Sequence, residues 1–289
     1  MIDVTHFTDP GCPWAYSAWP ALTTLRWRYG DGLHWKLVMI GLAEDSARYA
    51  RAGYTPAKSA VGQLRFRRFG MPLNPAPKAR LHATSPACRA IVAVRLHAPE
   101  LGDVALRALQ FAHFTTSALL DDPRTLRAAL SGVDGLDADA VVDRIDAPEV
   151  WEAYEADRAA ARTAEGSPTE AQGRAANSDG AVRYTAPSLV FSNGSGVRLE
   201  AGGFQPIEGY DVVIANLDPG LARRAPADDP VSVLHAFPYP LATAEVAAVM
   251  TEHLGVPDLA RAEELLVAAA GSGQVVRHAA GDSALWSPA

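Results

Sequence analysis

Residues 2–42, "IDVTHFTDPGCPWAYSAWPALTTLRWRYGDGLHWKLVMIGL", change from an extended pattern to a helical one and back. Residues 2–7 are rich in β-branched and aromatic side chains, which is typical of a buried strand. Residues 13–29 repeat apolar side chains at three- and four-residue spacing and predict a helix, and residues 33–42 predict a second strand. A strand, a helix and a strand over so short a stretch predict a βαβ unit with parallel strands.

The turn between the first strand and the helix holds Cys12, one of only two cysteines in the chain. Pro13 suits the first helical turn, where its missing N–H needs no partner. Cys12 therefore lies where unsatisfied N–H groups and the positive end of the helix dipole favour a thiolate, and such positions lower the pKa of a thiol. We interpret Cys12 as a reactive nucleophile; the alternative is a small buried apolar residue.

The middle of the chain, residues 56–177, has helical patterns only. Strand character returns at residues 186–194 and 196–203, which are joined by an Asn-Gly-Ser-Gly hairpin turn, and a helix follows at 206–217. The order βαβ plus ββα predicts a split thioredoxin-like α/β domain, residues 1–55 and 178–220, with an all-helical insertion at 56–177. The helices expected in the insertion are 56–69, 85–97, 100–119, 122–130, 137–145, 147–164 and 168–176.

The C-terminal part, residues 230–289, follows a polar, Pro-rich linker at 218–230. Residues 241–256 and 257–273 predict two helices and residues 274–288 a β-ribbon, which together form a winged-helix-like appendage. Its charge argues against DNA binding, because a recognition helix in an acidic segment repels phosphates. We expect it to pack, to dimerise or to cover the active site. Its basic residues are Arg261 and Arg277, against Glu245, Glu252, Asp258, Glu263, Glu264 and Asp282.

The pattern F-x-D-P-x-C-P-W at residues 7–14, followed by an aromatic helix, resembles the DsbA family of thioredoxin-like oxidoreductases, and within it the FrnE-like branch. The resemblance covers about residues 1–217: the turn, the helical insertion and a strand that opens with proline. It implies thiol–disulfide chemistry at Cys12. It also implies a cis proline that faces the sulfur, and the segment "YTAPSLVF" makes Pro187 that residue, preceded by Ala186.

The sequence departs from this family at one position, because the family motif ends in a second cysteine and this chain has Ala15 there. Without a resolving thiol, Cys12 cannot form a local disulfide. Cys88 lies on an apolar face of the expected helix 85–97, which favours a core residue over a resolving thiol. We therefore expect a single-thiol mechanism with no tightly bound cofactor. Glutathione or another low-molecular-weight thiol is the candidate co-substrate.

Two other functions fit the same fold. The resemblance extends to 2-hydroxychromene-2-carboxylate isomerase and kappa-class glutathione transferases, which implies, as an alternative, a thiol-dependent cis–trans isomerase or transferase for a small conjugated substrate. The second alternative is a non-catalytic chaperone or binding protein. A lowered pKa of Cys12 would count against that last function, since an inert thiol needs no activation.

Several side chains near the turn are candidates for binding the substrate. Trp14 and Tyr16 flank the cysteine, but aromatic residues at helical spacing are more often core residues than substrate contacts. His82 and His113, in the insertion, are candidate acid–base partners of the sulfur, although a structural role is the commoner one for such histidines. The basic–aromatic stretch "LRFRRF", 64–69, could hold an anionic substrate, but a solvated helix face that buries its two Phe rings is the favoured interpretation. The substrate-binding candidates are Pro13, Trp14, Ala15, Tyr16, Ala186 and His82.

Composition excludes several classes of function. A net charge of −7 argues against a nucleic-acid partner. The eight histidines show no metal-ligand spacing, so we expect no metal. Two cysteines make no disulfide framework, and neither a signal peptide nor a membrane span is apparent. We expect a cytoplasmic, bacterial enzyme without a membrane partner. It would act on a small molecule or a thiol or disulfide substrate, and a homodimer is one expected arrangement.

Overall fold

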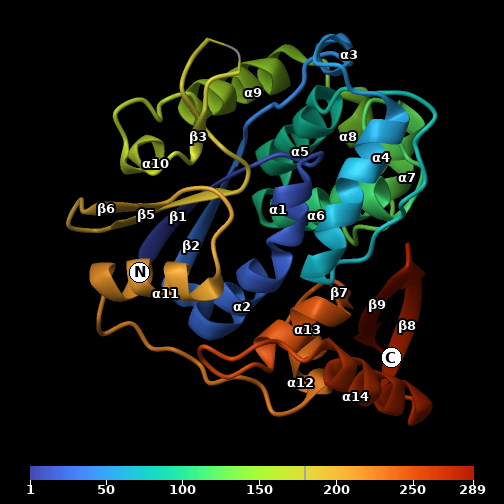
Figure 1. Ribbon diagram of the computed structural model, residues 1–289, viewed down its shortest axis with the longest axis vertical. Coiled ribbons are helices and arrows are strands. Elements are labelled where there is room, and N and C mark those ends of the chain that lie inside the picture. The colour runs from blue at the N-terminus through green and yellow to red at the C-terminus, as the bar shows by residue number, and fades with distance from the viewer. Residues whose placement is uncertain (179) are drawn as a thin grey trace.

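The computed structural model of the protein describes residues 1–178 and 180–289 (Figure 1). Its central sheet has the strand order β2-β1-β5-β6. β1 and β2 are parallel, with Ile2 opposite Leu33, and β5 is antiparallel to both β1 and β6. This arrangement confirms the βαβ unit, the hairpin and the thioredoxin-like fold. The strands are β1 (Ile2–Thr8), β2 (Leu33–Met39), β5 (Ser188–Asn193) and β6 (Arg198–Ala201).

Helices cover both faces of this sheet. α11 (Ile207–Leu217) contacts α2 (Trp19–Tyr29), β5 and β6, whereas α9 (Pro148–Ala161) contacts β2. The predicted helix 13–29 is broken into α1 (Pro13–Ser17) and α2, because Pro20 in the first turn of α2 cannot donate a backbone hydrogen bond to α1. The break lets α1, which follows the cysteine, pack separately from α2.

The insertion forms a group of helices beside the sheet (Figure 1). The predicted helix 56–69 is α-helical only to Leu64 and continues as a 3-10 helix, and α3 was not predicted. The sequence also missed β3 (Ala175–Ala176), which pairs with β4 (Arg183–Tyr184), so the insertion is not helical throughout. Its helices are α3 (Ala47–Arg51), α4 (Pro56–Leu64), η2 (Arg65–Phe69), α5 (Ser85–His97), η3 (Pro99–Leu101), α6 (Gly102–Thr115), α7 (Pro123–Leu130), α8 (Ala138–Asp143), α9 and α10 (Pro168–Ala171).

The C-terminal part forms a small unit with its own core, which includes Leu234, Leu266 and Trp286. The two helices and the hairpin that we predicted are present. The sequence missed a helix at the end of the Pro-rich linker, where the Asp229 side chain caps the helix by accepting a hydrogen bond from the Ser232 N–H. The elements are α12 (Pro230–His235), β7 (Leu241–Ala242), α13 (Thr243–Val249), α14 (Leu259–Gly271), β8 (Val275–Ala280) and β9 (Ser283–Pro288), with the sheet order β7-β9-β8.

A buried ion pair joins this C-terminal unit to the rest of the molecule. The Arg107 guanidinium on α6 donates to both carboxylate oxygens of Glu245 on α13, at 2.7 and 2.9 Å. The Thr23 hydroxyl on α2 donates to the same carboxylate at 2.6 Å. The side chains of both ions are at most 3% exposed. One buried carboxylate therefore connects α2, α6 and α13.

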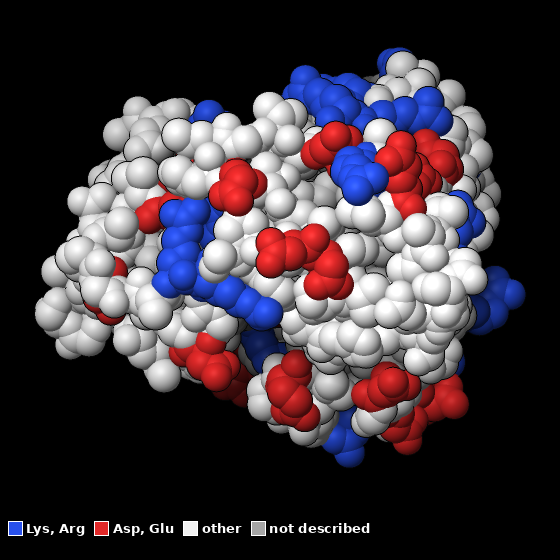
Figure 2. Space-filling model, turned by 90° about the horizontal axis from the view of Figure 1, so that it is seen from below, with Lys and Arg blue, Asp and Glu red and all other residues white. Residues whose placement is uncertain are grey.

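Figure 2 views the molecule from the side of the C-terminal unit. Among the described residues on this face, basic side chains form patches that alternate with acidic ones and with uncharged surface. No helix in the described part of the chain is long and apolar enough to cross a membrane. The bounds of the split domain, residues 1–55 and 178–220, stay a prediction. Position 179 lies outside the described residues.

Candidate active site

The turn that carries Cys12 is held by backbone and side-chain groups of Asp9. The Cys12 N–H donates to the Asp9 carbonyl at 3.1 Å, and the Gly11 N–H donates to Oδ1 of Asp9 at 2.8 Å. A Cβ atom on Gly11 would lie 2.4 Å from the methyl group of Thr84, so any larger residue here would displace the Thr84 side chain. Cys12 is the N-cap of α1, and Pro13 opens the helix as predicted.

The predicted partners of the turn meet at the sulfur. The Cys12 thiol donates a hydrogen bond to the carbonyl of Ala186 at 3.2 Å. The Ala186–Pro187 peptide bond is cis, as the family resemblance implies. Ala15, which stands where the family motif has its second cysteine, is 2% exposed in the same apolar cluster as Cys12 and Ala186. The structure therefore brings Cys12, Ala15 and the segment 186–187 together.

The ionisation of Cys12 differs from the expectation. Burial raises the pKa of the Cys12 thiol to about 12, against the lowering effect of the backbone N–H groups of Ala15 and Trp14, and the charge of Asp9 raises it further. The expected lowering was wrong because the residue is only 6% exposed, so the cost of removing a thiolate from water exceeds the stabilisation at a five-residue helix. In this conformation the thiol is protonated at neutral pH.

Asp9 lies directly below the turn and was not singled out from the sequence. Its Oδ2 accepts from the Leu42 N–H at 2.8 Å, from the Thr84 hydroxyl at 3.0 Å and from the Cys88 thiol at 3.5 Å. Burial raises the pKa of Asp9, and these donors act in the opposite direction. Cys88 is completely buried, in agreement with its interpretation as a core residue. In the sequence, only the position of Asp9 in the D-P-G-C pattern could have indicated a role in the turn.

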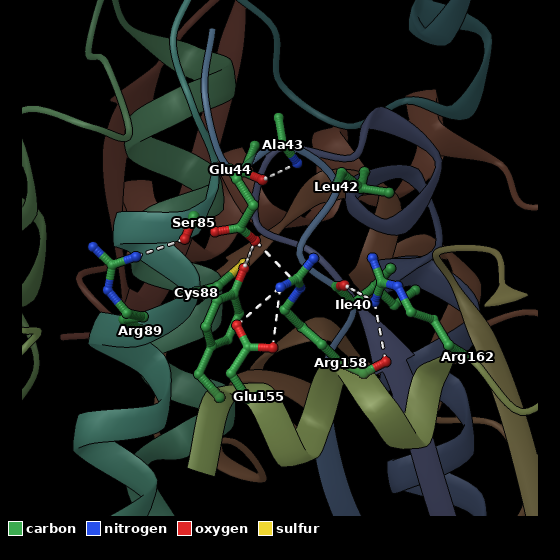
Figure 3. A network of polar contacts seen from close by, with 12 residues as sticks. Ile40, Leu42, Ala43, Glu44, Ser85, Cys88, Arg89, Glu155, Arg158 and Arg162 are labelled. Atoms are coloured by element: carbon green, nitrogen blue, oxygen red, sulfur yellow. Dashed lines mark hydrogen bonds and ion pairs between the residues drawn. The ribbon is translucent and has the colours of Figure 1, made fainter. Parts of the chain in front are cut away.

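The loop that donates to Asp9 is itself fixed by a polar network (Figure 3). The Tyr154 hydroxyl donates to Glu44 at 2.7 Å, and Arg158 forms ion pairs with both Glu44 and Glu155. Figure 3 shows Glu44 and Glu155 pointing to the Arg158 guanidinium, with Cys88 behind them. Gly41 has a φ of +67°, and a Cβ atom there would lie 2.3 Å from the Tyr154 oxygen. The network holds the residues after β2 against α9.

The two aromatic side chains of α1 lie in different surroundings. Tyr16 is 1% exposed, donates its hydroxyl hydrogen to the Pro72 carbonyl at 2.7 Å and stacks on Phe114. Tyr16 is therefore a core residue, and packing alone explains its position. Trp14 is half-buried among aromatic rings. Its partners are Phe66, Phe69 and Phe204, with ring centroids at 4.9, 5.8 and 5.5 Å.

A cavity of about 290 Å³ lies beside the turn. Gly11 and Pro13, the neighbours of Cys12 on either side, border it, and His82 and His113 lie in its wall with ring centroids 4.9 Å apart. Burial lowers the pKa of His82 to about 4, so its imidazole is neutral at neutral pH. No hydrogen bond joins His82 to Cys12 among the described residues, and His82 lies in the cavity wall.

The site combines these thiol, carboxyl, imidazole and aromatic groups with basic side chains in the cavity wall, among them Lys58, Lys78 and Arg80. Within residues 1–178 and 180–289, no three His, Cys, Asp or Glu side chains lie close enough together to hold a metal ion. A buried thiol opposite a backbone carbonyl, with a cavity beside it, can perform nucleophilic chemistry once the thiolate forms.

A family model described as the DSBA-like thioredoxin domain matches residues 3–184. The match includes the Cys12 turn and the insertion, and it ends before β5 and the C-terminal unit. No curated protein sequence matches the chain.

Solved structures share the fold at low sequence identity, which supports the fold alone. A candidate protein disulfide isomerase from Nitrosomonas europaea is 19% identical, with a TM-score of 0.56 over 74% of this chain and 96% of its own. The cytosolic disulfide reductase DsbM from Pseudomonas aeruginosa is 17% identical, with a TM-score of 0.52 over 75% and 100%. A candidate DsbA oxidoreductase from Streptomyces coelicolor is 15% identical, with a TM-score of 0.55 over 79% and 93%.

Proposed function

This chain belongs to the DSBA-like thioredoxin domain family, and from that membership we propose that it is an oxidoreductase that works through Cys12 alone, with a low-molecular-weight thiol. One observation carries the proposal: the Cys12 sulfur faces the Ala186 carbonyl beside the cis Pro187, while Ala15 replaces the second cysteine. Cys88 is fully buried against Asp9 and provides no accessible resolving thiol.

Glutathione supplies the second thiol in this mechanism. The Cys12 thiolate attacks the glutathione sulfur of a mixed disulfide R–S–S–G, forms a Cys12–glutathione disulfide and releases RS⁻, which takes up a proton. A second glutathione thiolate then attacks the bound glutathione sulfur, and Cys12 leaves as a thiolate. The products are RSH and glutathione disulfide. DsbM of Pseudomonas aeruginosa, which shares the fold, has been solved with GSH.

The mechanism requires the sulfur to leave its present environment. A thiolate cannot donate to the Ala186 carbonyl, and burial holds the Cys12 thiol protonated by raising its pKa. A substrate that donates its own hydrogen bond to this carbonyl replaces the thiol there, and movement of the turn toward water then permits ionisation. We place the reaction in the cytoplasm, because a lone thiol that depends on glutathione needs a reduced thiol pool.

Each of the two alternatives has one observation in its favour. The cavity favours the isomerase or transferase, because it can hold a small substrate and is bordered by Gly11 and Pro13, the two neighbours of the nucleophile in the chain. The raised pKa of Cys12 favours the non-catalytic binding protein, because a protonated, buried thiol is inert.

The deciding experiment is the formation and release of a glutathione adduct. The wild type, Cys12→Ser and Cys88→Ser are incubated with glutathione disulfide, followed by intact-mass analysis, and then treated with reduced glutathione. We expect one adduct on the wild type and on Cys88→Ser, removed by reduced glutathione, and none on Cys12→Ser. Absence of the adduct, or an adduct that reduced glutathione does not remove, would rule out monothiol turnover.

A further inference from the structure

We propose that a second cavity, between α2, the start of α11 and the C-terminal unit, binds a small organic amine with an apolar body. This interface cavity has a volume of about 230 Å³. Figure 1 shows α2 beside both α11 and α13, which it contacts. The inference goes beyond the proposed function and does not depend on it. Cys12 is not among the described residues that line the interface cavity, so binding there needs no thiol reaction.

Two segments of the wall lie beyond the residues that the family model matches. That match ends at residue 184, whereas residues 204–208 and the lining residues between 248 and 257 come after it. The first segment leads into α11, and the second runs from the end of α13 toward α14. Docking of the C-terminal unit on α2 and α11 therefore creates the interface cavity.

The unpaired charges in this wall are negative. Glu208, in the first turn of α11, and Glu252, after α13, line the interface cavity, and neither has an ion pair within the part of the chain that the structure describes. Arg28 is the one cation among the described lining residues. The buried Asp211 binds it at 2.5 Å, and also binds Arg223, outside the wall, at 3.2 Å. The two carboxylates therefore have no cation of their own, which favours a cationic ligand.

A buried hydroxyl group in the wall lacks a hydrogen-bond partner. Ser17 is 3% exposed, and its Oγ finds no partner among residues 1–178 and 180–289. The other hydroxyl groups of the wall bond within their own helices, because Thr24 donates to the Pro20 carbonyl at 2.8 Å and Thr251 to the Ala247 carbonyl at 2.6 Å. Unpartnered buried groups are uncommon in native proteins. An ammonium group has three N–H donors, so it can serve the Ser17 oxygen as well as a carboxylate.

The rest of the wall is apolar and aromatic. Phe69 and Phe204 lie with their ring centroids 4.7 Å apart, and aromatic faces attract an organic cation. A volume of about 230 Å³ is below the usual range for drug-sized ligands, so one ring or one short branched chain with a single amine fits. The other apolar residues of the wall are Pro20, Ala21, Pro206, Ile207, Ala248 and Pro257.

The experiment measures binding to the full chain by ligand-observed NMR titration at neutral pH. The probes are phenethylamine and phenethyl alcohol, which have nearly the same shape but differ in charge. We expect the amine to bind at least about fivefold more tightly, because hydrogen bonds to an ionised group are the stronger ones. The double variant Glu208→Gln, Glu252→Gln should remove most of this preference without affecting the alcohol. Glu263→Gln is the matched control, since Glu263 is exposed on α14 but does not line the interface cavity.

A further variant tests the buried hydroxyl group. Ser17→Ala should weaken binding of the amine about threefold or more, because the ammonium loses one acceptor. Equal affinity for the two probes, or a preference for the amine that survives in the double glutamate variant, would overturn the proposal. Amine binding that Ser17→Ala leaves unchanged would also overturn it, because the amine would then lie elsewhere on the molecule.

Discussion

The Cys12 thiol donates a hydrogen bond to the carbonyl of Ala186, which is 174 positions away in the sequence and 3.2 Å away in the structure. This contact connects the turn after β1 to the cis proline before β5. It also requires the protonated thiol, because a thiolate has no hydrogen to donate. The arrangement that identifies the site therefore represents its resting state, and the predictions below begin from that state.

The first prediction concerns the pH dependence of Cys12 reactivity. Because burial raises the pKa of Cys12 to about 12, the thiolate fraction at pH 7 is very small. We expect the alkylation rate with iodoacetamide to be low at pH 7 and to rise with pH, with no plateau between pH 6 and 9. The measurement uses Cys88→Ser, so that one thiol is followed by mass spectrometry. A plateau near pH 7 would show that the turn opens readily in solution.

The second prediction restores the dithiol motif. Ala15→Cys adds one sulfur atom one helical turn after Cys12, in a position only 2% exposed, and modest overpacking costs about 1 kcal/mol or more of folding free energy. We expect the introduced thiol to form a disulfide with Cys12 under oxidation, and the variant to gain insulin-reductase activity in the presence of dithiothreitol. Ala15→Ser is the control of similar size, and a gain of activity in that variant would contradict this explanation.

The third prediction tests the carboxylate below the turn. Asp9 accepts hydrogen bonds from Gly11, Leu42, Thr84 and Cys88. Asp9→Asn places an amide NH₂ against donors, so at least one buried group loses its partner. We expect the free energy of unfolding to fall by about 2–4 kcal/mol, as measured by urea denaturation. Asp134→Asn, at an exposed position, should change it little. Equal stabilities of the two variants would exclude a structural role for this carboxylate.

Residues 2–42 show why much of the fold was predictable. The β-branched and aromatic residues of β1, the helical period after Pro13 and the return to an extended pattern are local properties, and they determine the βαβ unit. The break at Pro20 and the end of the regular helix at Leu64 were missed, because apolar periodicity continues through both.

The site was predictable only in part, because its decisive properties depend on long-range contacts. The motif indicated Cys12, and the resemblance indicated Pro187. The burial that raises the pKa of Cys12 comes from residues of β5, β2 and α9 that pack around the turn, and no local pattern reveals it. The same holds for Asp9, whose partners come from three separate segments, and for the cavity, whose wall combines α4, η2 and the segment before α5.

The fourth prediction concerns the tip of the β8–β9 hairpin. Asp282 accepts from the Leu73 N–H at 2.8 Å and from Arg67 at 3.1 Å, and its own N–H donates to the Leu73 carbonyl. These bonds hold η2, whose Phe66 and Phe69 rings pack on Trp14. We expect Asp282→Ala to increase the rate of trypsin cleavage after Arg67 several-fold, followed by N-terminal mapping of the fragments. Asp228→Ala is the exposed control, and equal cleavage rates would show that the hairpin does not restrain η2.

The last prediction addresses the ion pair between Glu245 of the C-terminal unit and Arg107 of the insertion. Glu245→Gln leaves the Arg107 guanidinium buried without its counter-charge. The central carbon of this guanidinium lies 4.4 Å from the ring centroid of Trp19 and 4.3 Å from that of Tyr239. Removing one partner of a buried pair costs about 3–5 kcal/mol, because the other ion stays buried without a counter-charge. A variant that also removes the second charge avoids that penalty.

We therefore expect Glu245→Gln to be much less stable toward urea than the double variant Glu245→Gln, Arg107→Met. Glu252→Gln serves as the exposed control on the same unit and should match the wild type. If the single variant were as stable as the wild type, the unit would be held by apolar packing alone. If the double variant were the less stable one, the remaining contacts of Arg107 with Trp19, Tyr239 and the Pro240 carbonyl would contribute more than the relief of its unpaired charge.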